Sequence, residues 1–210
     1  MTKPEICIFF SDQHDARLVH ALGNEIVRTP NLDRLAAEGT ACTNAYTSYP
    51  LCVPARMSFL TGCLPSRTTV TSNNCALPSD RVTVAHLLAL AGYEATLCGR
   101  MHFVGPDQRH GFAERFVGDM TPVLWHRVGI DEERGEAFRG NFAQGGCLRS
   151  IGTGSSPVLE YDRVVVERAV EYFSGGDASA RANPGRPRFT VVGTYGPHFP
   201  YAAPAERHDY

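Results

Sequence analysis

The chain has 210 residues, of which 43% are hydrophobic and 20% are charged, with a formal net charge of −2. This composition is ordinary for a globular protein, and the scattered basic residues argue against a nucleic-acid partner. No apolar run reaches the ~18 residues that a membrane span needs, and residues 6–10 are too short for a signal-peptide core, so we expect a cytoplasmic protein with no membrane partner.

The first predicted element is a strand at residues 6–10, because the unbroken apolar run ICIFF is typical of a strand covered on both faces. A helix is predicted over residues 29–39, where Thr29 suits the N-cap, Pro30 the first turn and Gly39 the stop. A second helix begins at or just after Cys52 and stops at Gly62.

The second half of the chain repeats this alternation. Residues 84–91 predict a helix, and residues 93–98 predict a strand that ends at Gly99-Arg100-Met101-His102. Residues 161–173 predict an amphipathic helix, 174–187 a loop, and 189–194 a strand that ends at Tyr195-Gly196-Pro197-His198. Residues 118–158 are rich in Gly without sustained periodicity, and we expect them to form irregular cover over a site or a sheet edge.

Alternating strands and helices indicate an α/β fold with a mostly parallel central sheet flanked by helices. Such sheets bind ligands beyond the carboxyl ends of their strands. Three predicted strands end in polar side chains there, and the start of the second helix lies near the same edge. These side chains are Asp12, Gln13, Arg100, His102 and His198.

The seven cysteines are odd in number and form no Cys-x-x-Cys pair, so we expect reduced, mostly buried thiols. Cys52 differs from the other six in its surroundings. A helix start together with Arg56, one turn further on, would stabilise an anion at Cys52. The alternative is that Cys52 is one more packed thiol.

The stretch Cys52-Val53-Pro54-Ala55-Arg56, followed by Leu60-Thr61-Gly62, resembles the signature of the sulfatases of the alkaline-phosphatase-like superfamily. Further stretches resemble elements of the same family, and two of them, RMHFVGPDQRHGF at 100–112 and LPSRT at 64–68, are most similar to its choline-sulfatase branch. The others are Asp12-Gln13, TPNLDRLA at 29–36, Gly99-Arg100-Met101-His102 and GPHFP at 196–200.

The resemblance implies a catalytic centre made by modification. A maturation enzyme that reads Cys-x-Pro-x-Arg would convert Cys52 to formylglycine, whose hydrated aldehyde supplies the nucleophile. Asp12, Gln13 and the group at position 52 would bind a divalent metal, for which Ca²⁺ suits the oxygen donors best and Mg²⁺ or Mn²⁺ are alternatives.

The resemblance also implies roles for the remaining polar residues. Arg56 and Arg100 would stabilise charge on the sulfate, His198 would protonate the leaving oxygen, and His102 would deprotonate the second hydroxyl of the nucleophile. Asn73 would bind substrate. Outside the resemblance, Asp12 could cap a turn, the two histidines could be ordinary loop residues, and Asn73 could belong to a turn.

Arg100 departs from the family pattern, because most relatives have lysine at this position. A planar guanidinium group thus takes the place of a compact ammonium group. The resemblance covers residues 1–210 but only the N-terminal half of the family's usual chain. The family's second metal pair and a further lysine follow the position of His198, and no such segment is found before Tyr210. We therefore expect a truncated catalytic domain that lacks the C-terminal part of the fold.

The leading hypothesis is a sulfuric ester hydrolase that acts on a small sulfate ester such as choline sulfate. A phosphonate monoester or phosphodiester hydrolase of the same superfamily would share every residue named. The third hypothesis is an inactive, truncated homologue that acts as a binding module. Whether the chain forms a homo-oligomer stays open.

Overall fold

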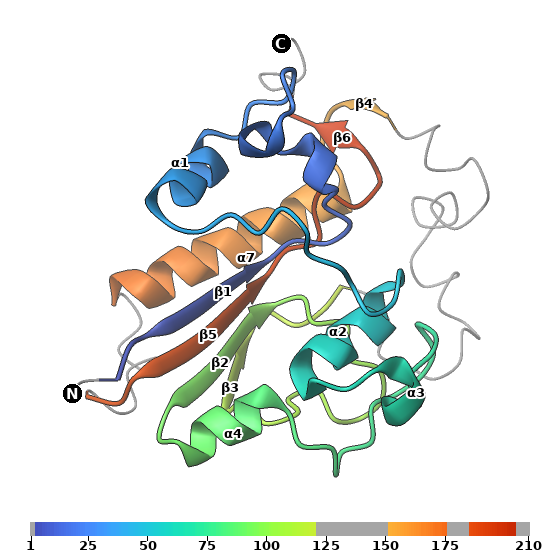
Figure 1. Ribbon diagram of the computed structural model, residues 1–210, viewed down its shortest axis with the longest axis vertical. Helices are drawn as coiled ribbons and strands as arrows, with labels where there is room; N and C mark the ends of the chain where they lie inside the picture. Colours follow the sequence, from blue (N-terminus) through green and yellow to red (C-terminus); the bar gives the residue numbers. More distant parts are fainter. Residues whose placement is uncertain (1–2, 121–150, 176–184, 205–210) are drawn as a thin grey trace.

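The computed structural model describes residues 3–120, 151–175 and 185–204. Its centre is a four-stranded sheet in the order β1-β5-β2-β3, and every neighbouring pair is parallel (Figure 1). The strands are β1 (Ile6–Phe10), β2 (Glu94–Gly99), β3 (Glu114–Phe116) and β5 (Arg188–Gly193). The predicted parallel α/β sheet is therefore confirmed.

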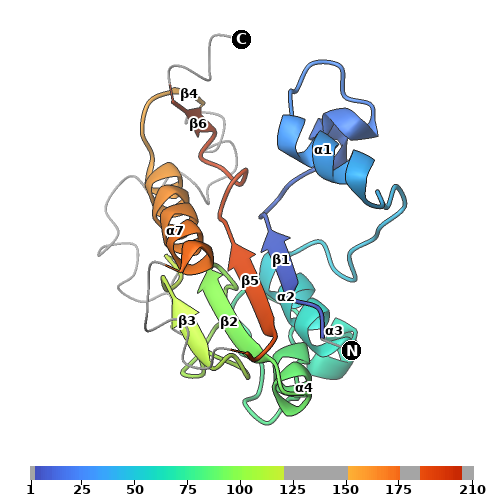
Figure 2. The same ribbon diagram turned by 90° about the vertical axis from the view of Figure 1, so that its left-hand side faces the viewer.

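Helices cover both faces of this sheet (Figure 2). On one face lie α2 (Cys52–Thr61) and α4 (Val84–Leu90), with the short α3 (Pro65–Thr68) beside them; on the other lies α7 (Pro157–Ser174). The remaining elements surround the carboxyl end of the sheet: η1 (Ala16–Leu18), η2 (His20–Leu22), α1 (Pro30–Glu38), and a small parallel pair of β4 (Gly152–Thr153) and β6 (Ala202–Ala203).

The two-residue period of the strands divides the core between the helices. Leu97 and Val191 pack with α2 and α4 in the larger apolar cluster, whereas the next residues along each strand, Cys98 and Val192, pack with Val165 of α7. Strands β2 and β5 are thus buried on both faces, as parallel strands with helices on either side are expected to be.

The prediction that β1 is covered on both faces is wrong for the described residues. Ile6, Ile8 and Phe10 pack toward the larger cluster, but Cys7 is exposed and Phe9 is 64% exposed. The reason is the position of α7, which packs mainly against β2 and β5. An apolar run alone cannot distinguish one covered face from two.

The predicted helices are confirmed, with shifts at their ends. Helix α7 begins at Pro157, four residues before the predicted start, because the Ser156 side chain accepts a hydrogen bond from the Leu159 backbone and proline fills the first turn. Most of the predicted irregular cover at 118–158, and residues 176–184 of the predicted loop, lie outside the described residues. Among the described helices, none is long and apolar enough to cross a membrane.

Candidate active site

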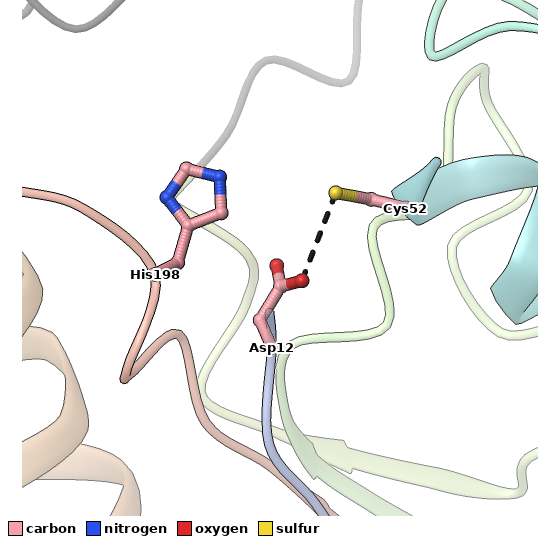
Figure 3. A group of neighbouring side chains, drawn as sticks. All are labelled: Asp12, Cys52 and His198. Carbon is pink, nitrogen blue, oxygen red and sulfur yellow. Dashed lines mark hydrogen bonds between the residues drawn. The ribbon is translucent and has the colours of Figure 1, made fainter. Parts of the chain in front are cut away.

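The carboxyl ends of three neighbouring strands bring the predicted polar side chains together. Asp12 follows β1, Arg100 follows β2, and His198 follows β5. Cys52, the first residue of α2, points its sulfur toward Asp12, and His198 approaches from the other side (Figure 3). Cys52 Sγ lies 3.7 Å from Asp12 Oδ1, and one ligand atom from each of the three residues lies within 4.8 Å of the others.

Arg100 occupies the centre of this edge and is fully buried. Its Nε donates to Asp12 Oδ2 at 2.6 Å, its Nη1 donates to Asp119 Oδ1 at 3.0 Å, and its guanidinium lies 4.1 Å from the Tyr195 ring centroid. The backbone here is tight: a Cβ at Gly193 would lie 1.9 Å from the Arg100 carbonyl oxygen. Glycine at 193 thus allows the chain after β2 to approach the end of β5.

Arg56 brings a second buried cation to the same carboxylate from helix α2. Its Nη1 donates to the Arg100 carbonyl at 3.1 Å, and its Nη2 lies 3.6 Å from Asp12 Oδ2. Within the described residues this Nη2 has no hydrogen-bond partner. The Arg56 guanidinium carbon lies 4.7 Å from the Phe10 ring centroid. Together with Arg100, Arg56 gives the site two buried arginines next to Cys52.

These charges set the protonation of Asp12 and Cys52. Burial opposes ionisation of Asp12, but Arg100 and Arg56 outweigh it and lower the pKa of the carboxyl, so Asp12 is an anion. Burial, reinforced by the Asp12 charge, raises the pKa of the Cys52 thiol despite the two arginines. The expectation that the helix start and Arg56 favour an anionic sulfur is therefore wrong, because desolvation and Asp12 dominate.

His102 is held as a neutral hydrogen-bonding group. Arg100 Nη2 donates to its Nδ1 at 2.9 Å, and its backbone N–H donates to Asp119 Oδ2 at 2.7 Å. Burial and then the Arg100 charge lower the pKa of His102 to about 3. Since a guanidinium can only donate, Nδ1 is an acceptor and the ring proton lies on Nε2. This geometry favours donation from Nε2 over the predicted role as a base.

His198 is oriented by its own loop. Its Nδ1 donates to the Phe199 carbonyl at 2.8 Å, and its ring packs edge-on against Tyr195. The loop is tied to α7 by Asp162, which accepts hydrogen bonds from the backbone N–H groups of Tyr195 at 2.6 Å and Gly196 at 2.7 Å. Burial lowers the pKa of His198, so the ring is neutral near pH 7.

A family model described as "Sulfatase" matches residues 4–209. The chain belongs to the sulfatase family. A choline-sulfatase of Rhizobium meliloti (strain 1021) is 36% identical over 206 residues, which is 96% of this chain and 40% of the relative. Arylsulfatase A of Bos taurus is 38% identical over 127 residues, covering 55% of this chain and 25% of the relative.

Solved structures agree on the fold. A 2-O GAG sulfatase superposes with a TM-score of 0.62 at 25% identity, covering 93% of this chain and 35% of that one. The phosphonate monoester hydrolase of Agrobacterium radiobacter gives a TM-score of 0.64 at 21% identity, covering 97% and 43%. The chain thus spans well under half the length of these relatives.

Two of the residues that the sulfatase resemblance assigns to the site are placed at its margin. Gln13 is exposed and its amide nitrogen donates to the Tyr201 hydroxyl at 3.1 Å, so its role as a metal ligand stays a prediction. Asn73 Oδ1 accepts a hydrogen bond from the Val53 backbone at 3.0 Å and so caps the start of α2. Its role in substrate binding also stays a prediction, and the cap gives it a structural one.

Sequence reasoning missed two carboxylates that shape this candidate site. Asp119 neutralises Arg100 and fixes His102, and Asp162 fixes the His198 loop. Asp119 lies in a segment without periodicity, which gave no signal. Asp162 falls on a predicted helix, where an acidic residue normally reads as part of a solvated face.

The described residues fit the divalent metal that the resemblance implies only in part. Asp12 offers Oδ1, because Oδ2 is held by Arg100, and Ca²⁺ normally gathers six to eight oxygens. Asp12 is thus the one described carboxylate among the predicted ligands, and a hard cation here would need oxygens from outside the described residues.

Replacing Asp119 by asparagine is expected to destabilise the fold. Asparagine can still accept one hydrogen bond, but the buried Arg100 charge would lose a partner, which costs on the order of 3 kcal/mol for a buried ion pair. Urea unfolding of Asp119→Asn should show a clearly lower midpoint than the parent. Glu160→Gln, which removes an exposed partner of Arg163, is the matched control and should unfold like the parent. Equal midpoints for all three chains would contradict the assignment.

Proposed function

We propose that this chain carries the nucleophile, both arginines and both histidines of a sulfuric ester hydrolase in which Cys52 is converted to formylglycine. The observation that carries the proposal is the position of Cys52. It opens α2 within the Cys-x-Pro-x-Arg stretch and lies beside the buried groups of Asp12, Arg56 and Arg100. A maturation enzyme that reads this stretch is the implied partner, and a cytoplasmic location is part of the same proposal.

The charge balance of the site supports a role for a bound cation. Arg56 and Arg100 are offset by Asp12 and Asp119, and the thiol and both histidines are neutral, so these groups sum to about zero. A sulfate ester is an anion and would gain little net attraction from such a site. A divalent cation, with Asp12 as one ligand, would supply the missing positive charge at the sulfate oxygens.

The proposed chemistry assigns a task to each of the chain's own groups. Formylglycine at position 52 would supply a hydroxyl nucleophile next to Asp12. Arg56, whose Nη2 has no hydrogen-bond partner among the described residues, can donate to a sulfate oxygen as charge develops. His102 can donate from Nε2 to the group at position 52, and His198, once protonated on Nε2, can protonate the leaving oxygen.

The substrate class proposed is a small sulfate monoester, and choline sulfate is favoured by the similarity to a choline-sulfatase over 96% of this chain. A phosphonate monoester or phosphodiester is the second candidate, since the phosphonate monoester hydrolase shares the fold. Both substrates would place an anionic centre before the same nucleophile and arginines.

Comparing turnover of nitrophenyl sulfate with that of a phenylphosphonate ester tests the proposal. We expect the sulfate ester to be hydrolysed faster, and Cys52→Ala to lose roughly a thousandfold or more because it removes the nucleophile. Cys63→Ser changes a cysteine outside the site and should keep the parent's rate. A faster phosphonate reaction would overturn the sulfatase assignment, and near-native turnover by Cys52→Ala would overturn the nucleophile.

Mass spectrometry of the peptide that contains Cys52 tests the modification separately. After co-expression with a maturation enzyme, the peptide should lose the mass difference between a CH₂SH and a CHO side chain. The peptides that contain Cys63 and Cys75 serve as internal controls and should keep their thiols. A thiol that persists at position 52 under these conditions would favour the third hypothesis, a homologue that binds a ligand but does not turn over substrate.

Substituting His198 should affect substrates in proportion to their need for an acid. In His198→Ala, turnover of an ester with a poor alkoxide leaving group should fall by about a hundredfold or more, which is the usual range for loss of a general acid. Turnover of a nitrophenyl ester, whose leaving group needs no proton, should fall far less. His14→Ala, which changes an exposed histidine close by, is the control. Equal losses for both kinds of ester would show that His198 does not act as the acid.

A further inference from the structure

Asp12, Cys52 and His198 present three different donor atoms to one point: a carboxylate oxygen, a sulfur and an imidazole nitrogen (Figure 3). This set is unlike the oxygen-rich shell of Ca²⁺ but suits zinc, which binds sulfur, nitrogen and oxygen with four ligands. We propose that, while residue 52 is an unmodified cysteine, these three side chains bind a zinc-type divalent cation. The proposal concerns the thiol form of the chain and does not depend on its turnover of sulfate esters.

The spacing between the sulfur and the carboxylate matches such an ion. Typical Zn–S and Zn–O bonds of about 2.3 and 2.1 Å at a tetrahedral angle separate the two ligand atoms by about 3.6 Å. Cys52 Sγ and Asp12 Oδ1 are 3.7 Å apart, with the thiol donating its proton toward the oxygen. A cation that replaces this proton would find both atoms at bonding distance without a backbone shift.

The imidazole of His198 is prepared as the third ligand. Its Nδ1 donates to the Phe199 carbonyl at 2.8 Å, so the neutral ring keeps its lone pair on Nε2. A second ring nitrogen bonded to a backbone carbonyl is the usual outer arrangement of metal-binding histidines. Figure 3 shows the ring nitrogen remote from the Cβ on the side of the ring that faces Cys52. The ligand atoms of the three residues lie within 4.8 Å of one another. A small rotation of the His198 side chain would bring its nitrogen to bonding distance of an ion held by the other two.

The carboxylate of Asp12 is also held in an orientation that suits a metal ligand. Arg100 binds Asp12 Oδ2 at 2.6 Å, which fixes the carboxylate plane and leaves Oδ1 toward Cys52. Binding breaks the S–H bond, releases that proton to solvent and forms a metal–sulfur bond, with no change of oxidation state. Asp12, Asp119 and the thiolate then offset most of the positive charge of the ion and the two arginines. Water would complete the fourth position.

One consequence is that the chemical state of residue 52 selects the metal. Formylglycine has no sulfur, so conversion removes the softest donor and leaves a site that favours hard cations with oxygen ligands. The unmodified chain would therefore hold Zn²⁺ in preference to Ca²⁺, and the converted chain would not.

Cobalt substitution reports directly on the sulfur. Chain produced without a maturation enzyme should bind one equivalent of Co²⁺ with a near-ultraviolet sulfur-to-cobalt band, and Zn²⁺ should displace it while excess Ca²⁺ does not. Cys52→Ser should abolish the band. His198→Ala removes a proposed ligand and should weaken Co²⁺ binding by at least the roughly tenfold to hundredfold that is typical for loss of an outer-shell partner. Cys63→Ser and His14→Ala, the matched controls, should bind like the parent. A band that survives Cys52→Ser, or an equal effect of the controls, would overturn the site.

Alkylation of the unsubstituted chain gives a test that needs no variant. Zn²⁺ should slow iodoacetamide labelling of Cys52, read by peptide mass spectrometry, while Cys63 and Cys75 react at unchanged rates. Ca²⁺ at the same concentration should leave all three rates unchanged. Protection of Cys52 by Ca²⁺ as well as Zn²⁺, or by neither ion, would overturn the proposal. Neither outcome bears on whether a converted chain hydrolyses sulfate esters, so the two proposals fail independently.

Discussion

The buried carboxylate of Asp12, held between the guanidinium groups of Arg100 and Arg56, is the interaction on which the rest of the site depends. Removing an ion from water costs several kcal/mol in a protein interior, so each buried charge requires its partner in place. Asp12 follows β1, Arg100 follows β2 and Arg56 belongs to α2. One carboxylate thereby fixes the relative positions of two strand ends and the helix that carries Cys52.

The same network determines which groups hold protons. Arg100 donates to Asp12, Asp119 and His102 together, and this leaves His102 neutral with its proton on Nε2. Burial, and then the charge of Asp12, raise the pKa of the Cys52 thiol although two cations lie close by. A site built this way has little net charge of its own. Its affinity for an anion or a cation therefore depends on what else is bound, rather than on a fixed surplus of one sign.

The sequence predicts the local elements well, because prolines and glycines at helix ends act over a few residues, as at Pro30 and Gly62. Thr29 is the N-cap residue of α1 as predicted, but its hydroxyl donates to Asp33 and does not cap the helix. It also predicts that Asp12, Arg100 and His198 meet, since parallel strands share a carboxyl edge. It cannot place Asp119, which acts through contacts across the fold from an aperiodic segment. The exposed face of β1 has the same cause: whether a helix lies over a strand is decided by packing elsewhere in the chain.

The presence of arginine at position 100 and the state of residue 52 are connected through Asp12. A lysine ammonium is a compact charge, whereas the Arg100 fork binds Asp12, Asp119 and His102 at once and commits Asp12 Oδ2 to a hydrogen bond. Only Oδ1 then faces Cys52, so in the proposed site, with Asp12 Oδ1 and His198 as fixed ligands, the group at position 52 would decide which metal is preferred. With sulfur there, the donors are those of zinc; with an aldehyde hydrate, they are oxygens. In the proposed site, metal choice would therefore depend on one covalent modification more than on the number of acidic residues.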